Sequence, residues 1–382
     1  MTKLKDVIKN LDKPLFFLTL ILFILGLIMI FSASNVTSYM KGGSPYAYFI
    51  RQSIFLIASF IICIFLSKFN TKVYGLASNL LLFIFIIILI LLFIYGEATN
   101  KARSWFYIGP FGFQPSEFIK ITMVVFMARY YEVKEGKLNN FITAVIPLLI
   151  GVFITFLIMI QPDLGTAIIF ACLTGIIFLS TPIPKIIKSK VLLLLGGMLA
   201  VVVFTLIMTG GKILQSRQLE RFNFTNPCDR LLDTGNQVCN GYIAINNGGL
   251  TGVGLGNSTQ KYLYLPEPYT DFIFVVIVEE LGLVTGIIII LAYIYLLYRI
   301  LKIGRESYDN TGALICYGVA VYIFLHIAVN LLGLFGLMPM TGVPLPFMSY
   351  GGSFTLCLMV ALCLVQRVAI ETKLYAKKTL KK

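Results

Sequence analysis

Carboxylates at the start of one long apolar segment are the side chains of this sequence best placed for chemistry. Asp271 ends the stretch Tyr264-Leu265-Pro266-Glu267-Pro268-Tyr269-Thr270-Asp271, and an apolar run follows it. A carboxylate fixed at a helix start and partly removed from water could act as a general base or hold a divalent cation. The alternative is that Asp271 only caps the helix. Glu279 and Glu280, about two turns further along, favour an electrostatic role, although both could be structural hydrogen-bonding groups.

A second charged group lies near the start of another predicted helix. The motifs Gln114-Pro115-Ser116-Glu117 and Gln161-Pro162-Asp163 each precede a predicted membrane span. Proline suits the first turn of a helix, and an acid there complements the helix dipole, which accounts for Asp163. Glu117 differs, because Lys120 follows three residues later on the same face. Charges inside a membrane are costly and normally pair and face a cavity, so a functional role and a structural pairing both stay open.

Several familiar kinds of site are excluded. His326 is the only histidine and lies in a predicted span near Asn330, which rules out a histidine-based zinc site and a Ser/His/Asp set. We predict that it is a packed, hydrogen-bonded residue. The glycines between residues 248 and 256 do not follow a strand of a βαβ unit, so they do not form a dinucleotide site. We predict plain turns there, the alternative being backbone N–H groups that hold an anion.

The elements that must position these side chains are membrane-spanning helices. The 382 residues are 58% hydrophobic and only 13% charged, which leaves too few polar groups to cover a water-exposed surface. About 20 mainly apolar residues cross a hydrocarbon core. We predict one integral membrane domain over residues 1–382 with ten spans: Leu15–Ser34, Ile54–Ser67, Leu76–Tyr95, Ser116–Tyr131, Phe141–Ile160, Leu164–Leu179, Val191–Thr209, Asp271–Ile300, Ala313–Leu337 and Ser353–Val368.

Three polar segments break this pattern and are expected on the outer side. They are Gly96–Pro115, Gly210–Thr270 and Met338–Gly352. The large middle segment is too long for a simple connector, and long ordered loops are usually functional. It contains Cys228 and Cys239, which could form a disulfide although two cysteines alone do not prove one.

The distribution of lysine and arginine predicts the orientation, because short basic loops stay in the cytoplasm. An even number of spans places both termini on one side. With the N-terminus inside, the inner segments carry most of the 31 basic residues and the whole net charge of +14. This topology explains the excess of basic over acidic residues better than nucleic-acid binding does. The first span is too long for a cleaved signal sequence, so we expect it to stay as an anchor.

Four motifs in register with the ten spans resemble the SEDS family, which contains FtsW, RodA and SpoVE. They are Arg103-Ser104-Trp105 with the Gln114 motif and Lys120, then Gln161-Pro162-Asp163-Leu164-Gly165-Thr166-Ala167, the Asp271 motif, and Pro344-Leu345-Pro346-Phe347-Met348-Ser349-Tyr350-Gly351-Gly352-Ser353. The resemblance covers nearly the whole chain. The segment Gly254–Lys261 is more similar to FtsW or SpoVE than to RodA. Two departures are Phe354, where a second serine is common, and Pro268-Tyr269, which replace a small residue and a histidine.

The resemblance implies a ten-helix all-α bundle with cytoplasmic termini, in the cytoplasmic membrane of a bacterium. It implies a peptidoglycan glycosyltransferase that polymerises lipid II during cell division, or in sporulation or elongation. Asp271 would be the general base or metal ligand, and Glu117 and Lys120 would also be catalytic, with Glu117 positioning Lys120. The leaving pyrophosphate would need cations, for which the candidates are Arg103, Lys120, Arg217, Arg221 and Lys261. The candidates for substrate binding are Arg103, Trp105, Gln114, Asp163, Arg217, Arg221, Lys261, Glu267, Ser349 and Gly351. A divalent Mg²⁺ or Mn²⁺ could assist, and no organic cofactor is expected.

The expected partners are lipid II, a class B penicillin-binding protein with transpeptidase activity, other division or elongation membrane proteins, and membrane lipid. The chain has no S-x-x-K, S-D-N and K-T-G set of its own. Small residues could admit a single-pass partner helix or could pack within the bundle, namely Gly312, Gly318, Gly333 and Gly336.

Two rival functions are a lipid II transporter and a non-catalytic scaffold. Charged intramembrane residues also mark transport pathways, but here the buried acids cluster in the outer half, which favours an enzyme. A scaffold would leave the Asp271 and Glu117 clusters unexplained.

Overall fold

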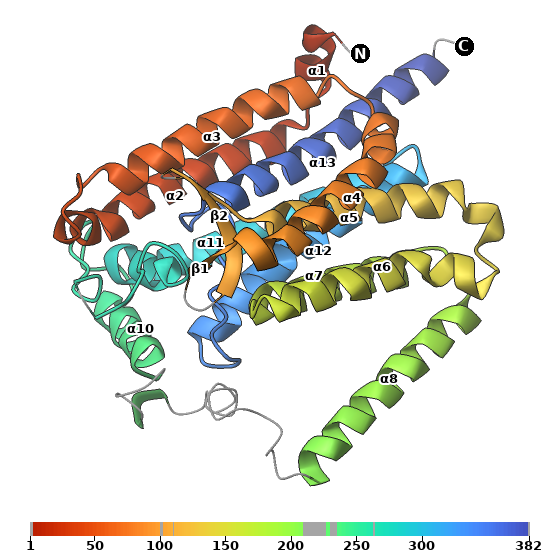
Figure 1. The fold of residues 1–382 in the computed structure, drawn as a ribbon. Coiled ribbons are helices and arrows are strands. Elements are labelled where there is room, and N and C mark those ends of the chain that lie inside the picture. The colour runs from red at the N-terminus through yellow and green to blue at the C-terminus, as the bar shows by residue number, and fades with distance from the viewer. Residues whose placement is uncertain are drawn as a thin grey trace.

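The protein is a bundle of long helices with one small sheet, seen in a computed structural model that describes residues 3–99, 102–109, 111–208, 227–229, 235–262 and 264–380 (Figure 1). Helices are expected, because in lipid every backbone N–H and C=O must find its partner inside the segment. The α-helices of these parts are α1 (Leu4–Asn10), α2 (Lys13–Met40), α3 (Ala47–Leu66), α4 (Thr71–Tyr95), α5 (Pro115–Val133), α6 (Phe141–Ile160), α7 (Leu164–Ser180), α8 (Lys185–Met208), α10 (Gly235–Gly248), α11 (Ile273–Arg305), α12 (Asn310–Leu334) and α13 (Gly352–Thr379).

Each predicted span coincides with one of these helices. Within the described parts of the chain, seven helices are long and apolar enough to cross a membrane: α2, α3, α4, α6, α11, α12 and α13. Of the other three, α7 is apolar but has 17 residues, and α5 carries Glu117, Lys120, Arg129 and Glu132. The helix α8 overlaps the span predicted at Val191–Thr209. The largest difference in length is at α13, which continues eleven residues beyond the predicted end at Val368 and reaches Thr379.

The segment after α4 contains a sheet that we did not predict from the sequence. Three antiparallel strands lie in the order β1 (Glu97–Thr99), β2 (Ala102–Ile108) and β3 (Phe111–Phe113). Glu97 pairs with Trp105, and Phe106 pairs with Phe113. The aromatic and β-branched residues of β2 favour a strand, and Gly109, with a φ of +60°, permits the reversal into β3. The all-α prediction is therefore wrong for this segment.

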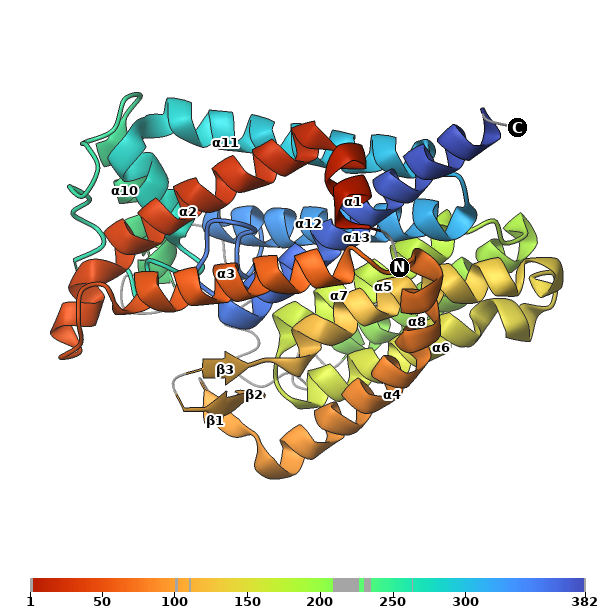
Figure 2. The same ribbon diagram turned by 90° about the horizontal axis from the view of Figure 1, so that it is seen from above.

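The helix α12 lies at the centre of the bundle, where it packs against α5, α7, α11 and α13 (Figure 2). The close approach to α5 requires Gly318, because a Cβ there would lie 2.5 Å from Val124 Cγ1. Gly312 and Gly333 are also buried, against other residues of the same bundle. Gly336 has a φ of +62° in the turn after α12. Packing within the bundle is therefore confirmed for Gly312, Gly318 and Gly333.

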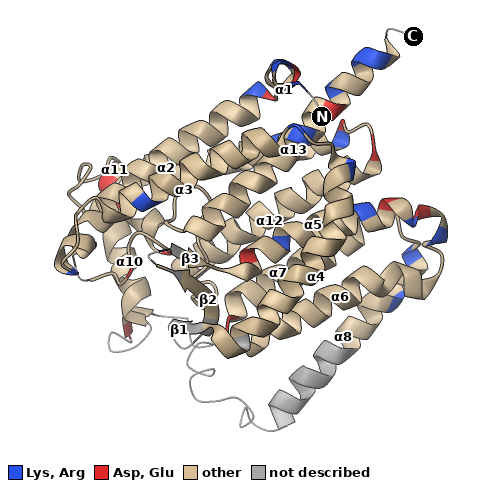
Figure 3. Ribbon diagram, turned by 45° about the horizontal axis from the view of Figure 1, so that its top comes forward, with Lys and Arg blue, Asp and Glu red and all other residues tan. Residues whose placement is uncertain are grey.

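Both termini lie at the same end of the bundle (Figure 1), and Figure 3 shows that most of the lysine and arginine residues gather at this end. Ion pairs join the helices there. Asp12 Oδ2, just before α2, lies 2.6 Å from Arg299 Nη2 of α11. Within α13, Arg367 Nε lies 2.8 Å from Glu371 Oε1. This is the end that the charge distribution assigns to the cytoplasm.

The helix α11 is interrupted at Gly282, which has a φ of +86°. The loop after α10 provides hydrogen-bond partners for the interrupted turn: Val253 N donates to Glu279 O at 3.0 Å, and Leu283 N donates to Gly249 O at 2.9 Å. The approach is so close that a Cβ on Gly252 would lie 2.3 Å from Glu280 O. The glycines of residues 248–256 therefore form turns, as predicted.

This contact predicts that Gly252→Ala destabilises the protein. Gly252 has a φ of +83° and its Cβ position is filled by backbone, so strain and overpacking combine to cost about 2 to 4 kcal/mol. The matched control is Gly256→Ala, which has a similar φ of +87° but open space, and which should cost about 1 kcal/mol. Thermal unfolding of the detergent-solubilised protein measures both, and equal shifts in Tm would contradict the packing argument.

Candidate active site

Asp271 lies in the turn just before α11. The N-cap residue of that helix is Phe272, and no side chain caps the helix, so the alternative that Asp271 is only a cap is wrong. Its Oδ1 atom accepts a hydrogen bond of 2.8 Å from Thr270 Oγ1. Burial raises the pKa of the Asp271 carboxyl above its ordinary value, and the bond from Thr270 offsets only part of this rise. A carboxylate with a raised pKa is the stronger proton acceptor.

Residues of α12 and of the segment between α12 and α13 bind the backbone around Asp271. The Nδ2 atom of Asn330 donates to the backbone oxygen of Asp271 at 3.0 Å and to that of Val343 at 2.9 Å. Ser349 Oγ donates to Thr270 O at 2.5 Å. Ser349, predicted from its motif to bind substrate, therefore touches the residue next to Asp271.

A narrow recess adjoins the Asp271 side chain. It is lined by Asp271, Val329, Asn330, Met340, Thr341, Gly342 and Val343. A Cβ added at Gly342 would lie 3.8 Å from Asp271 Oδ2. Gly342 therefore lies directly beside the carboxylate.

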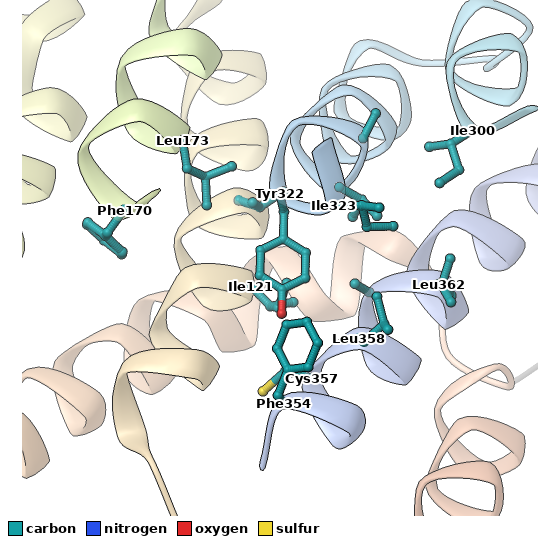
Figure 4. Packing of buried hydrophobic residues seen from close by; sticks show 14 of the residues in the cluster. Ile121, Phe170, Leu173, Ile300, Tyr322, Ile323, Phe354, Cys357, Leu358 and Leu362 are labelled. Atoms are coloured by element: carbon teal, nitrogen blue, oxygen red, sulfur yellow. The ribbon is translucent and has the colours of Figure 1, made fainter. Parts of the chain in front are cut away.

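The second charged group is buried between α5 and α12. Lys120 Nζ lies 2.7 Å from Glu117 Oε1, and neither side chain is more than 3% exposed. The same Nζ atom lies 3.1 Å from His326 Nε2, and Tyr322 OH lies 3.4 Å from Glu117 Oε2. Figure 4 shows Tyr322 projecting from α12 towards Phe354 of α13. Glu117 and Lys120 thus form an ion pair, which is compatible with both predicted roles, and His326 is the packed, hydrogen-bonded residue that we predicted.

The two Gln-Pro motifs lie against each other. Gln114 Nε2 donates to Asp163 Oδ2 at 3.2 Å, and Asp163 Oδ1 accepts from Thr166 N at 3.1 Å. Asp163 thus caps α7, as its position after proline predicts. Trp105 is half-buried in β2 and stacks against Tyr107 with ring centroids 6.3 Å apart.

Of the basic residues predicted to bind substrate, Lys261 is the one whose side chain the structure describes. Lys261 is buried, with Nζ 2.7 Å from Glu280 Oε1, so its charge is already neutralised. Glu279 accepts from Thr259 N at 3.2 Å, so both glutamates are hydrogen-bonding groups, as the structural alternative predicted. Arg217 and Arg221 lie outside the described residues. Arg103 lies in β2, where only its backbone is described.

The remaining predicted residues lie at the edges of this region. Glu267 is exposed and its Oε1 atom lies 3.3 Å from Lys41 Nζ, just beyond α2. Lys41 is therefore a cation beside the Asp271 segment that sequence reasoning missed. Gly351 donates its backbone N–H to Gln52 Oε1 at 3.2 Å and precedes α13.

The oxygen ligands at Asp271 suit a shared divalent cation better than a protein-only site. Among the residues that the structure describes, no group of three or more His, Cys, Asp or Glu side chains is arranged to hold a metal ion. Mg²⁺ commonly takes one or two carboxylates and completes its shell with substrate phosphates and water. Asp271 would supply one carboxylate of such a shell, and the other oxygens would have to come from outside the protein.

The large outer segment contains the disulfide that the sequence allowed. Cys228, in the short 3₁₀ helix Pro227–Asp229, is bonded to Cys239 in α10. The disulfide joins the short 3₁₀ helix to α10. The loop that follows α10 contacts the interrupted turn of α11 at Gly282.

Tyr322 and Asn330 are site residues that we did not predict. With His326 they recur every four residues on one predicted span, which places them on one helix face. A polar stripe inside an apolar helix is a signal that could have found them.

The fold and the buried charges define a multi-pass helical membrane protein with charged groups enclosed between its helices. Two solved structures share this fold. A chain of a peptidoglycan synthase complex, studied for the coordination of polymerization and crosslinking, is 24% identical and has a TM-score of 0.76, with 95% of this chain and 98% of that chain covered. RodA, the rod shape determining protein of Thermus thermophilus, is 23% identical and has a TM-score of 0.67, with 94% and 96% covered.

Residues 13–374 match the family model FtsW/RodA/SpoVE, described as cell cycle protein. The probable peptidoglycan glycosyltransferase FtsW of Bacillus subtilis is 35% identical over 377 residues, which are 97% of this chain and 93% of that protein. Stage V sporulation protein E of Bacillus subtilis is 34% identical over 355 residues, covering 91% and 94%. The chain therefore belongs to the FtsW/RodA/SpoVE family, which confirms the resemblance drawn from the motifs.

Proposed function

We propose that this protein is a peptidoglycan glycosyltransferase that polymerises lipid II into glycan strands at the outer face of the bacterial cytoplasmic membrane. Family membership with relatives named as glycosyltransferases supports the activity. The observation that carries the assignment to a site is Asp271, a buried carboxylate with a raised pKa that lines a narrow recess. A carboxylate of this kind suits general base catalysis.

In the proposed reaction, the acceptor sugar hydroxyl attacks the anomeric carbon of the donor. Asp271 accepts the hydroxyl proton while the new carbon–oxygen bond forms. The bond from the anomeric carbon to the pyrophosphate breaks, and its electron pair leaves with the pyrophosphate oxygen. In the alternative role, Asp271 would hold a divalent cation, which would supply positive charge to neutralise the leaving pyrophosphate. Lys41, near Glu267, provides a protein cation on this side of the bundle.

Incubation of the purified full-length protein with lipid II tests this function directly. With its class B penicillin-binding protein present, we expect glycan polymer that a muramidase digests. A protein that moves lipid II across vesicles without forming polymer would be a transporter, and the proposal would fail.

The activity of Asp271 should depend on pH with a defined sign. The deprotonated carboxylate is the active form, and burial raises the pKa of this group. We therefore expect kcat/KM to fall as the pH is lowered, with a midpoint above pH about 4, where an exposed aspartate titrates. Rates measured from pH 8 to pH 4 on folded protein check this. A constant rate down to pH 4 would contradict the assignment of Asp271 as base.

We further propose that all ten spans cross the membrane and that both termini are cytoplasmic. In a variant without native cysteines, single cysteines near Gly136 and Lys188 should be shielded from membrane-impermeant thiol reagents in intact cells, whereas one near Gly235 should react. The expectation follows from the basic inner segments. Labelling in the reverse pattern would place Asp271 on the wrong side of the membrane.

The proposed partner is a class B penicillin-binding protein that crosslinks the glycan strands. One structural neighbour is a chain of a peptidoglycan synthase complex that both polymerises and crosslinks. We assign the cell process to division or sporulation, because the relatives given above include an FtsW and a stage V sporulation protein.

A further inference from the structure

Three polar side chains form a stripe along α12 that connects the two charged parts of the site. Tyr322, His326 and Asn330 follow one another at four-residue intervals, so they lie on one face of the helix. All three are buried in the bundle, and His326 and Asn330 are 0% and 4% exposed. A polar residue is costly at such a position unless it is hydrogen-bonded. The hydrogen-bond partners of these three side chains therefore indicate what each side chain holds in place.

In the middle of the stripe, next to Tyr322, His326 binds the Lys120 ammonium group. The Lys120 Nζ atom donates to His326 Nε2 at 3.1 Å, while His326 Nδ1 lies 3.4 Å from the backbone oxygen of Pro344. A neutral imidazole with its proton on Nδ1 satisfies both contacts, because Nε2 then accepts and Nδ1 donates. His326 thereby connects Lys120 to the segment that follows α12.

At the other end, Asn330 binds the backbone of Asp271. Its amide nitrogen donates to Asp271 O at 3.0 Å and to Val343 O at 2.9 Å. Both partners are carbonyl acceptors, so the side-chain amide has only one orientation that satisfies them. Asn330 is one helical turn, about 6 Å, from His326, and their partners Val343 and Pro344 are neighbours in sequence.

We propose that His326 and Asn330 are positioning residues that hold Asp271 and the Glu117–Lys120 pair in one fixed geometry through the segment Val343-Pro344. This inference rests on the proposed glycosyltransferase function and adds two residues to it. Neither side chain acts on substrate in this account. Each acts through another group, Lys120 for His326 and Asp271 for Asn330.

The test measures kcat and KM for lipid II with full-length protein and its penicillin-binding partner. His326→Phe keeps an aromatic ring between Tyr322 and Phe354, with centroids now 4.8 Å and 4.7 Å from His326, but it removes both hydrogen bonds. Asn330→Leu removes the donor to both carbonyls. A small misplacement of reacting groups costs about 100-fold in rate, so we expect each variant to lower kcat about 10-fold to 100-fold with KM changed less than about threefold.

Two further variants separate positioning from a general loss of stability. His326→Gln retains one acceptor and one donor, and it should restore kcat to within about fivefold of wild type. Phe324→Leu, at a 52% exposed position of the same helix, is the matched control and should leave kcat and KM unchanged.

The double variant decides whether the two residues act together. If both hold one geometry, His326→Phe with Asn330→Leu should lose no more kcat than the more damaged single variant. The proposal is overturned if the loss of kcat in the double variant equals the product of the two single losses. It is also overturned if the folded single variants keep the wild-type kcat, or if His326→Gln does not recover it. If His326→Phe does not fold, the kcat of Asn330→Leu decides alone. An inactive wild-type protein would instead refute the proposed function.

Discussion

Asp271→Asn should yield a folded, membrane-inserted protein whose glycan polymerisation rate is lower by a factor of about 100 to 10,000, the usual contribution of a general base. The amide retains the shape of the carboxylate and can still accept the 2.8 Å hydrogen bond from Thr270. The backbone contact with Asn330 does not involve the side chain of Asp271 and should persist. Only the proton-accepting charge is lost.

Asp309→Asn makes the same chemical change away from the proposed site and serves as the control. Asp309 caps α12 by accepting from Gly312 N at 2.9 Å, and asparagine caps helices equally well. Activity and Tm should therefore stay near wild type. Polymerisation by Asp271→Asn at a rate similar to that of this control would refute the general-base assignment.

Lys120→Met should destabilise the protein strongly and abolish polymerisation. The Lys120 ammonium group is 0% exposed and lies 2.7 Å from Glu117. Removing one partner of a buried ion pair leaves the other charge uncompensated, which typically costs about 3 to 5 kcal/mol. The loss of Tm in detergent measures this cost, and Lys302→Met, in an exposed pair with Glu306, should cost less than about 1 kcal/mol.

The double variant Glu117→Gln with Lys120→Met separates stability from function. Neutralising both partners removes the buried charge, so most of the lost Tm should return. Polymerisation should stay low if the pair positions substrate or Asp271 as proposed. A stable double variant with normal kcat would show that the pair is purely structural.

The long apolar spans and the charged motifs could be predicted from sequence because both depend on local rules. Hydrophobic length identified the helices, and the position of Asp163 after Gln161-Pro162 predicted a cap that the structure confirms. The β2 strand was missed because a short aromatic run between two spans is ambiguous between strand and loop.

Other features depend on contacts between residues far apart in the chain. Lys261 was predicted to bind substrate, but it pairs with Glu280, which lies 19 residues further along the chain. The tie from Asn330 to Asp271 spans 59 residues. No local pattern specifies such pairings, although the four-residue spacing of polar side chains on α12 marks the face where they occur.

The central position of α12 also has a consequence for how the protein is made. The Lys120 side chain is synthesised 206 residues before His326. At about 5 to 20 residues per second, the charged turn of α5 enters the membrane roughly 10 to 40 s before its histidine and tyrosine partners exist. During this interval the buried charges of α5 lack the side chains of α12 that contact them in the folded protein. The retention of α5 in the bilayer must then depend on neighbouring helices or the insertion machinery, and chains that stop before α12 should be prime substrates for membrane proteases.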